Sequence, residues 1–234
     1  ILILWLYACI TGLSPSVVRA SLMFSLITIG QSFSRPMNIY NTIAVSAFIV
    51  LLINPYLLFE VGFQLSYLAV ISIIFFQPRI YRLIYIKHYI PDKLWALFTV
   101  SIAAQIGTAP ISIYYFHQFP NYFFISNFIV IPAATIILIS SILVLIFSFL
   151  PAVSSVLAYI LGCLIKALNS SVTFIDNLPY STTENIYTDS YQTLFIYTTI
   201  ILITIYLVYK KYLHLKLTLI SIIFLLIYLI YLNY

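Results

Sequence analysis

Apolar residues run through this sequence in long uninterrupted stretches that are separated by short polar turns. The stretches do not alternate at every second residue, so they are typical of membrane helices and not of a membrane barrel. They cover, in order, residues 1–11, 15–30, 41–53, 56–76, 94–115, 122–150, 152–174, 191–209 and 217–231. The pattern predicts an all-α, polytopic membrane bundle of about seven to nine hydrophobic segments, some of them short or broken.

Composition supports the same class. Hydrophobic residues make up 64% of the chain and charged residues 6%, whereas a soluble domain carries roughly 25% charged residues. No long hydrophilic stretch interrupts the apolar runs, so residues 1–234 are expected to form a single transmembrane domain. The first residue is Ile1 and not methionine, and we interpret the sequence as a fragment of a longer protein.

The placement of charge predicts an orientation. Residues 77–93 and 210–216 are basic, and residues 176–190 are acidic. Because cytoplasmic loops carry an excess of lysine and arginine, both basic stretches are expected inside and the acidic loop outside. The first basic stretch can be a plain loop or a short amphipathic helix on the membrane surface. Two cations fall on the outer side: Lys166 can reach the acidic loop, but Arg19 has no such loop beside it.

One polar motif, residues 55–66, interrupts the apolar pattern. It places Glu60, Gly62, Gln64 and Ser66 at membrane depth. An ionisable group at that depth costs at least about 2.5 kcal/mol on insertion scales, so it normally has a partner or faces a polar cavity. We therefore expect Gly62 and Gln64 to shape and line a path through the membrane, together with Ser66.

Glu60 admits two interpretations. Paired with Arg19 or Arg35, it forms a neutral structural ion pair, and a buried pair costs roughly 3–5 kcal/mol to break. Alone in a pathway, the carboxylate would instead favour a proton or a cation. The orientation puts the motif at about the same depth as Arg19, so the predicted pair is Glu60 with Arg19.

Small polar residues also recur at helical spacing on two segments, which places them on one face of each helix. The two stripes are Ser21, Ser25, Thr28 and Ser32, and Ser101, Gln105, Thr108 and Ser112. Hydroxyl stripes commonly pack membrane helices against each other, while Gln105 and Thr108 are further candidates for lining a path. The first stripe lies roughly opposite Arg19 on its helix and cannot share a lumen with it.

No catalytic pattern accompanies these residues. The three histidines are isolated in sequence, and no HxH, HExxH or GxSxG pattern or carboxylate cluster occurs. Cys9 and Cys163 lie in apolar runs without CxxC spacing, which indicates small buried hydrophobic residues. We expect no enzyme activity, no cofactor and no metal site.

Three sequence elements together resemble a known family. They are residues 12–20 (GLSPSVVRA) followed by Met23, residues 54–66 (NPYLLFEVGFQLS), and residues 105–110 (QIGTAP) with 116–119 (FHQF), Asn127 and Pro132. In this order, over about residues 5–200, they resemble the membrane domain of the ComEC-type competence proteins. The sequence departs from the family near Asn38 and Asn54, where an acidic residue is often found. Family members usually also have an OB-like domain, and many have a nuclease domain; this chain has neither, so no nuclease activity is assigned to it.

The resemblance implies a channel domain that carries single-stranded DNA across the bacterial cytoplasmic membrane during competence for transformation. The polar residues then become a predicted DNA path, formed by Arg19, Gly62, Gln64, Ser66, Gln105 and Thr108. The implied partners are single-stranded DNA, the lipid bilayer, other DNA-uptake components, soluble domains of the same full-length protein and, where the energy source is separate, a cytoplasmic motor.

Two other functions stay open. Broken helices with polar residues at the midplane are also typical of small-solute or ion transporters. Inverted repeats in the two halves would favour a transporter, and none is visible in the sequence. The third possibility is a membrane scaffold that only anchors soluble domains.

Overall fold

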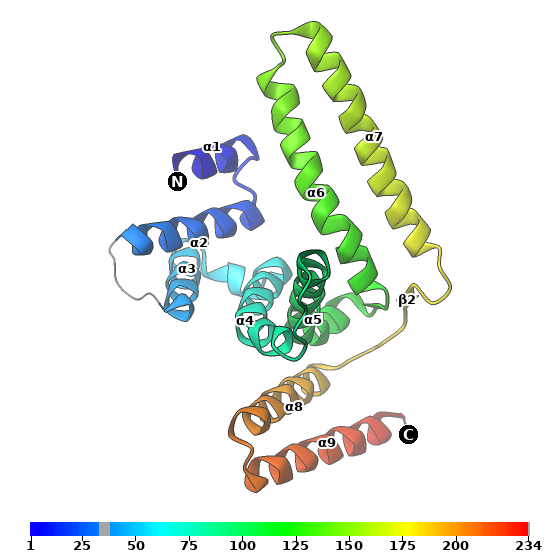
Figure 1. Cartoon of the computed structure of the whole chain (residues 1–234). Helices are drawn as coiled ribbons and strands as arrows, with labels where there is room; N and C mark the ends of the chain where they lie inside the picture. Colours follow the sequence, from blue (N-terminus) through cyan, green and yellow to red (C-terminus); the bar gives the residue numbers. More distant parts are fainter. Residues whose placement is uncertain (33–37, 234) are drawn as a thin grey trace.

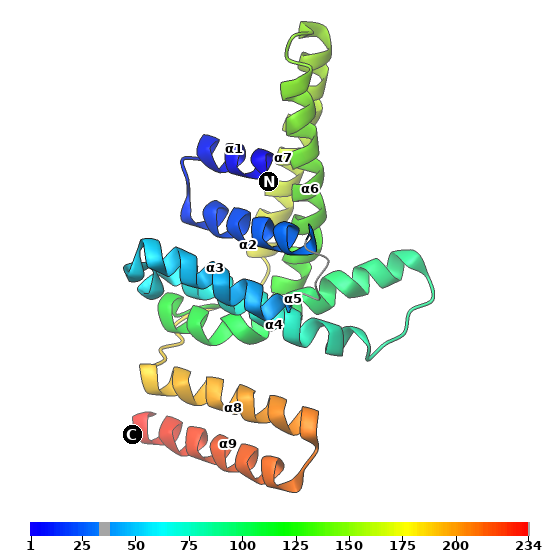
Figure 2. The ribbon, with the colours of Figure 1, turned by 90° about the vertical axis from the view of Figure 1, so that its left-hand side faces the viewer.

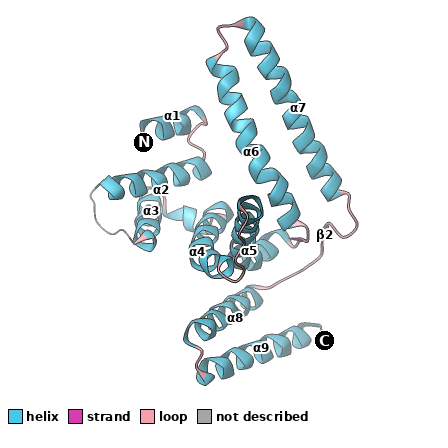
Figure 3. Ribbon diagram, in the orientation of Figure 1, coloured by secondary structure: helices cyan, strands magenta, loops and turns pink. Residues whose placement is uncertain are grey.

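The structure, a computed structural model, describes residues 1–32 and 38–233, and helices make up most of it (Figures 1 and 3). In chain order the elements are α1 (Leu2–Ile10), α2 (Pro15–Ser32), α3 (Ile39–Ile53), the 3₁₀ helix η1 (Pro55–Phe59), α4 (Val61–Tyr81), α5 (Tyr89–Phe116), β1 (Phe119–Pro120), α6 (Phe123–Ile146), α7 (Pro151–Asp176), β2 (Thr182–Thr183), α8 (Ser190–Tyr209) and α9 (Tyr212–Asn233). This architecture confirms the predicted all-α membrane bundle. Arg35, the alternative partner of Glu60, lies outside the described residues.

The helices fall into two length classes. Within the described part of the chain, the five helices α4 to α8 are long and apolar enough to cross a membrane. Three further apolar stretches are shorter, at residues 15–30, 39–53 and 212–228. Because a straight span needs about 20 residues, the predicted segments separate into full-length spans and shorter pieces, as the apolar pattern indicated.

Two asparagines set the helix boundaries before the polar motif. The Asn38 side chain accepts a hydrogen bond from the Tyr40 amide at 3.0 Å and begins α3. Asn54 ends α3 and accepts from the Tyr56 amide at 3.1 Å, which starts η1 with Pro55 in its first turn. Asparagine and aspartate cap helices about equally well. The two departures from the family pattern therefore keep the capping function that an acidic residue would have at these positions.

A close contact between α4 and α5 forms the centre of the molecule. Gly107 of α5 lies directly against Ser72 of α4: a Cβ atom built at Gly107 would come within 1.8 Å of the Ser72 Oγ and within 3.1 Å of the Leu68 carbonyl oxygen. Ala103, one turn earlier on α5, is completely buried. Small residues let the backbones of membrane helices approach closely, and this spacing fixes α4 and α5 as one unit.

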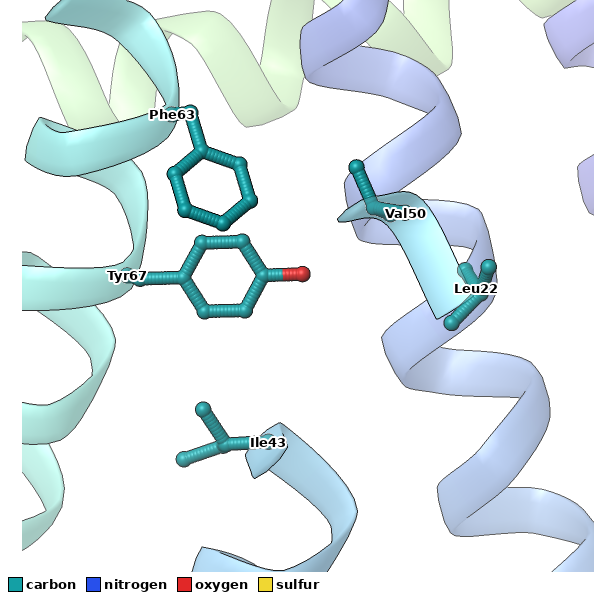
Figure 4. Packing of buried hydrophobic residues seen from close by; sticks show 5 residues of the cluster. All are labelled: Leu22, Ile43, Val50, Phe63 and Tyr67. Atoms are coloured by element: carbon teal, nitrogen blue, oxygen red, sulfur yellow. The ribbon is translucent and has the colours of Figure 1, made fainter. Parts of the chain in front are cut away.

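Helices α2 and α3 pack on this pair around a small apolar cluster. Leu22, Ile43, Val50, Phe63 and Tyr67 are buried together (Figure 4). The Phe63 and Tyr67 rings lie 4.5 Å apart, and the Tyr67 hydroxyl lies 3.2 Å from the buried Ser46 Oγ. The cluster joins the N-terminal helices to the start of α4, where the polar motif lies.

Two helical hairpins extend from the centre. The α6–α7 hairpin projects well beyond the other helices in two views at right angles, and the α8–α9 hairpin lies on the opposite side of α5 (Figures 1 and 2). In the most apolar 18-residue stretch of α6, and in that of α7, no residue is buried. Leu138 and Ile139 of α6, for example, are exposed. A lipid environment explains this exposure, because hydrocarbon is as apolar as these side chains.

Three expectations from the sequence are wrong in detail. Residues 77–93 contain no separate surface helix, because α4 continues to Tyr81 and α5 begins at Tyr89; the plain-loop alternative holds for residues 82–88 between them. The second basic turn is shorter than residues 210–216, since α9 already starts at Tyr212. The helices extend into both stretches because backbone hydrogen bonds must be satisfied internally near the membrane, and residues 82–88 and 210–211 connect them without helix. Cys9 and Cys163 are exposed rather than buried.

Candidate functional site

The polar motif forms a break between two helices. η1 ends at Phe59, Glu60 adopts an extended conformation (φ −76°, ψ 125°), and α4 begins at Val61. The Gln64 side chain reaches back across this break, and its Nε2 donates a hydrogen bond to the Leu58 carbonyl oxygen at 3.0 Å. Gln64 thereby satisfies a carbonyl that the helix break would otherwise leave unpaired. The motif is a bend that its own amide side chain holds in place.

Arg19 of α2 contacts the first turn of α4. Its Nη2 donates to the Gly62 carbonyl oxygen at 3.2 Å, and its Nη1 lies 3.8 Å from the Glu60 Oε2. A Cβ built at Gly62 would meet the same Nη2 at 3.5 Å, an ordinary contact distance. A cation beside a helix N-terminus is electrostatically unfavourable, and the Glu60 carboxylate counteracts this effect. The structure thus brings Arg19, Glu60 and Gly62 together.

The two members of this ion pair differ in exposure. The Arg19 side chain is 5% exposed, whereas that of Glu60 is 43% exposed. Among the described residues, the Arg19 Nε and Nη1 have no hydrogen-bond partner. The guanidinium therefore lies inside the α2–α4 contact, and the carboxylate is the accessible member. The polar stripe of α2 faces elsewhere: the Trp5 Nε1 of α1 donates to the Ser25 Oγ at 3.1 Å, as expected for a face opposite Arg19.

Gln64 also lines a pocket between three helices. The pocket has a volume of about 260 Å³ and is lined by Gln64 of α4, by Ile111, Tyr114 and Tyr115 of α5, and by Ser190, Thr193, Leu194 and Tyr197 of α8. We call it the Gln64 pocket. The Tyr114 hydroxyl lies 3.1 Å from the Ser190 Oγ, and the Tyr197 hydroxyl donates to the Gly107 carbonyl oxygen at 2.8 Å. These bonds fix two aromatic rings beside an amide and several hydroxyl groups.

The Gln64 pocket was not evident from the sequence. The chain has 21 tyrosines, and their abundance resembles compositional drift with some interfacial belt residues. Tyr114 and Tyr115 come shortly after the QIGTAP element, at the end of the same apolar run. Tyr197 lies in the middle of a later run with no marker beside it. Only the packing of α5 on α4 and of α8 on α5 brings these rings to Gln64.

The remaining predicted residues lie elsewhere. Gln105 and Thr108 are half-buried on α5 and do not line the Gln64 pocket. Ser101 of the same stripe contacts α6, since the Asn127 Nδ2 donates to the Ser101 Oγ at 3.3 Å. Ser66 is half-buried, about 200° around α4 from Gln64. Of the predicted path residues, Arg19 and Gly62 are therefore in contact, whereas Gln64, Ser66, Gln105 and Thr108 do not line one common pocket.

A two-stranded ribbon closes the end of the molecule where α5 stops and α8 starts. β1 and β2 pair antiparallel, with Phe119 opposite Thr183. The Asn121 Nδ2 adds hydrogen bonds to the Tyr180 carbonyl oxygen at 2.8 Å and to the Thr183 Oγ1 at 2.9 Å. The ribbon ties the α5–α6 turn to the α7–α8 loop near the Gln64 pocket. Within the described residues, no cluster of three His, Cys, Asp or Glu side chains suitable for a metal ion occurs.

Comparison with known proteins identifies the family. Residues 1–211 match the family model described as Competence protein. ComE operon protein 3 of Bacillus subtilis (strain 168) is 36% identical over 135 residues, a stretch that makes up 58% of this chain and 16% of that relative. No solved structure matches the chain. The resemblance carried by the three sequence elements is confirmed, and because the family match covers most of its length, this chain belongs to the competence protein family.

Proposed function

We propose that this chain forms part of the path by which single-stranded DNA crosses the bacterial cytoplasmic membrane during competence. The observation that carries the proposal is the Gln64 pocket, where the amide of the family motif lies beside Tyr114, Tyr115 and Tyr197. Membership of the competence protein family and five helices of membrane-spanning character support it.

The chemistry of the pocket suits a strand of any sequence. Stacking a base on an aromatic side chain contributes roughly 1–3 kcal/mol and tolerates every base, because each base has a π-face. Hydroxyl and amide groups at the pocket wall can form hydrogen bonds with base edges in place of water. A transport path needs such contacts to be numerous and individually weak.

The proposed partners of the chain are other DNA-uptake components that deliver the strand, soluble domains of the longer protein, and a motor that pulls the strand.

The neighbouring ion pair would protect this path from a repulsive charge. Glu60 is partly exposed one turn from Gln64, and a free carboxylate there would repel phosphates. Arg19, held by the Gly62 carbonyl, balances that charge from the protein side. In this proposal Arg19 acts by positioning and neutralising Glu60, and the pocket residues meet the strand.

DNA uptake in a competent strain tests the proposal. The full-length protein would carry Arg19→Ala, Glu60→Gln or Gln64→Ala, with membrane insertion verified for each. Tyr159→Ala is the matched control, because Tyr159 is 76% exposed on α7, away from the pocket. We expect labelled single strands to enter poorly with Gln64→Ala and normally with the control. Normal import by all three site variants would refute the proposed path.

A proton- or cation-coupled transporter is the second candidate. The helix break at Glu60 and the partial exposure of its carboxylate favour it, since transporters bind ions at broken helices. This alternative predicts a proton or cation flux in vesicles that Glu60→Gln abolishes and that does not require DNA.

A further inference from the structure

A second cavity lies between the last turns of α4 and α8, at the end of the molecule away from the β1–β2 ribbon. Its volume is about 530 Å³, within the range of about 300–1,000 Å³ that small-molecule sites occupy. It is lined by Phe75, Phe76, Arg79, Ile80 and Leu83 from α4 and the turn that follows, and by Thr204, Leu207 and Val208 from α8. We call it the Arg79 groove.

The groove exists because α8 is fastened to the centre only near its first half. The Ser190 and Tyr197 hydroxyl groups of α8 bond to α5, at Tyr114 and at the Gly107 carbonyl. Beyond Tyr197, α8 continues for about three turns to Tyr209. Along those turns Thr204, Leu207 and Val208 line the groove opposite α4.

Arg79 is held at the rim of the groove. Its Cζ lies 3.7 Å from the centroid of the Phe75 ring, a cation–π contact, and its Nη1 donates to the Phe75 carbonyl oxygen. A guanidinium has five N–H donors in a planar fork that matches the oxygens of a phosphate. Within the described residues, the bond to the Phe75 carbonyl uses one of them, so the fork keeps donors for a bound anion.

The same end of the molecule is positively charged. The turn after α4 and the start of α5 carry Arg82, Lys87 and Lys93, and the turn after α8 carries Lys210 and Lys211. The acidic residue there, Asp92, accepts a hydrogen bond from the Tyr81 hydroxyl. Basic pockets between membrane helices attract anionic lipid headgroups, and each cation near the surface adds to the attraction.

We propose that the Arg79 groove binds one anionic phospholipid. The phosphate lies on the Arg79 guanidinium, and an acyl chain lies along Phe76, Leu207 and Val208. Apolar walls beneath a single guanidinium match an amphiphile with one anionic head. A nucleic-acid strand would need several cations in a row, and Arg79 is the one cation among the lining residues. Such a lipid would fill the gap between α4 and α8 and hold the α8–α9 hairpin at a fixed angle.

Site-directed fluorescence quenching tests the proposal on the whole chain in bilayer vesicles. Trp5 and Trp95, the two tryptophans, are replaced by phenylalanine, and Leu207→Trp places a probe in the groove. Brominated phosphatidylglycerol should quench this probe more strongly than brominated phosphatidylcholine. Arg79→Gln should weaken the preference about fivefold, the effect of one surface cation.

Two controls make the result specific. Arg82→Gln removes a charge at the same end but outside the groove lining, and it should change the preference less than Arg79→Gln. Leu138→Trp on α6, where Leu138 is exposed, should be quenched equally by the two lipids. Equal quenching at Leu207→Trp would overturn the proposal. Relief of that quenching by a single-stranded oligonucleotide would also overturn it and assign the groove to nucleic acid.

A second measurement tests the proposal even if the Leu207→Trp variant does not fold. Native mass spectrometry of the unaltered chain, released from vesicles of mixed lipids, should retain one phosphatidylglycerol, and the Arg79→Gln chain should not. Retention of phosphatidylcholine instead, or equal retention by both chains, contradicts the proposal. Neither readout involves DNA transport, so each result can refute the lipid site without refuting the proposed DNA path.

Discussion

Arg19 on α2 donates a hydrogen bond to the carbonyl oxygen of Gly62 on α4, 43 residues later in the chain. The bond attaches the N-terminal helices to the first turn of α4 and brings the guanidinium next to Glu60. The polar motif is therefore joined to a neighbouring helix, and its carboxylate is not an isolated charge in hydrocarbon.

The Arg19–Glu60 pair predicts an asymmetry in stability. Glu60→Gln leaves a buried guanidinium without its counter-charge, whereas Arg19→Met leaves a carboxylate that is 43% exposed and can reach water. We expect Glu60→Gln to be the more destabilising, by about 1–2 kcal/mol once the exposure of Glu60 is allowed for. Thermal unfolding of the purified variants in detergent measures the difference.

The double variant completes this test. Arg19→Met with Glu60→Gln removes both charges, so the loss should be smaller than the sum of the two single losses by about 0.5 kcal/mol or more. Strict additivity would mean that the two side chains do not interact, and the ion pair would then have no role in the fold.

The α4–α5 contact predicts that Gly107→Ala is harmful. The added methyl group would collide with Ser72, which must move together with part of the α4 backbone. Overpacking of this kind typically costs about 1–3 kcal/mol. Ser72→Gly should restore part of the stability, because it removes both of the closest side-chain atoms. Gly162→Ala on α7 is the matched control: no atom lies within 4 Å of its added Cβ, so it should be neutral or stabilising.

The Gln64 pocket predicts that the ring of Tyr114 matters more than its hydroxyl. Tyr114→Phe keeps the stacking surface and loses only the contact with the Ser190 Oγ. Tyr114→Ala removes a contact worth roughly 1–3 kcal/mol per stacked base. In a DNA-uptake assay with equal protein levels, the Tyr114→Phe protein should import DNA at close to the normal rate. The Tyr114→Ala protein should import it several-fold more slowly. The reverse order would point to a hydrogen-bonding role for the hydroxyl.

The predicted orientation can be tested by cysteine labelling. Thr183 lies in β2, and Lys211 lies between α8 and α9. The membrane-spanning helix α8, which has 20 residues, therefore separates the two positions along the chain. Cysteines introduced at these positions, after replacement of the exposed Cys9 and Cys163 by serine, should react from opposite sides of the membrane. Reaction of both from the same side would refute the orientation derived from the basic turns.

Local sequence signals were enough to predict the helices. An apolar run long enough to span a bilayer must be helical, because its backbone polar groups have no other partners. Boundaries followed from short-range chemistry as well: Asn54 and Pro55 end α3 and start η1 where the sequence indicated. Prediction from local signals was less accurate at residues 77–93 and 210–216, where helix extends into charged sequence that is typical of a loop.

Beyond the contact of Arg19 with Glu60, which polar side chains meet was decided only by the tertiary structure. The sequence placed Gln64 and Gln105 in one predicted path, yet Gln64 lines a pocket with Tyr114 and Tyr197, and Gln105 does not line that pocket. Helical periodicity fixes which residues share a face of one helix, but it does not determine which neighbour that face contacts. Here the neighbour is set by non-local packing, above all by the approach of Gly107 to Ser72 and by the bond from Tyr197 to Gly107.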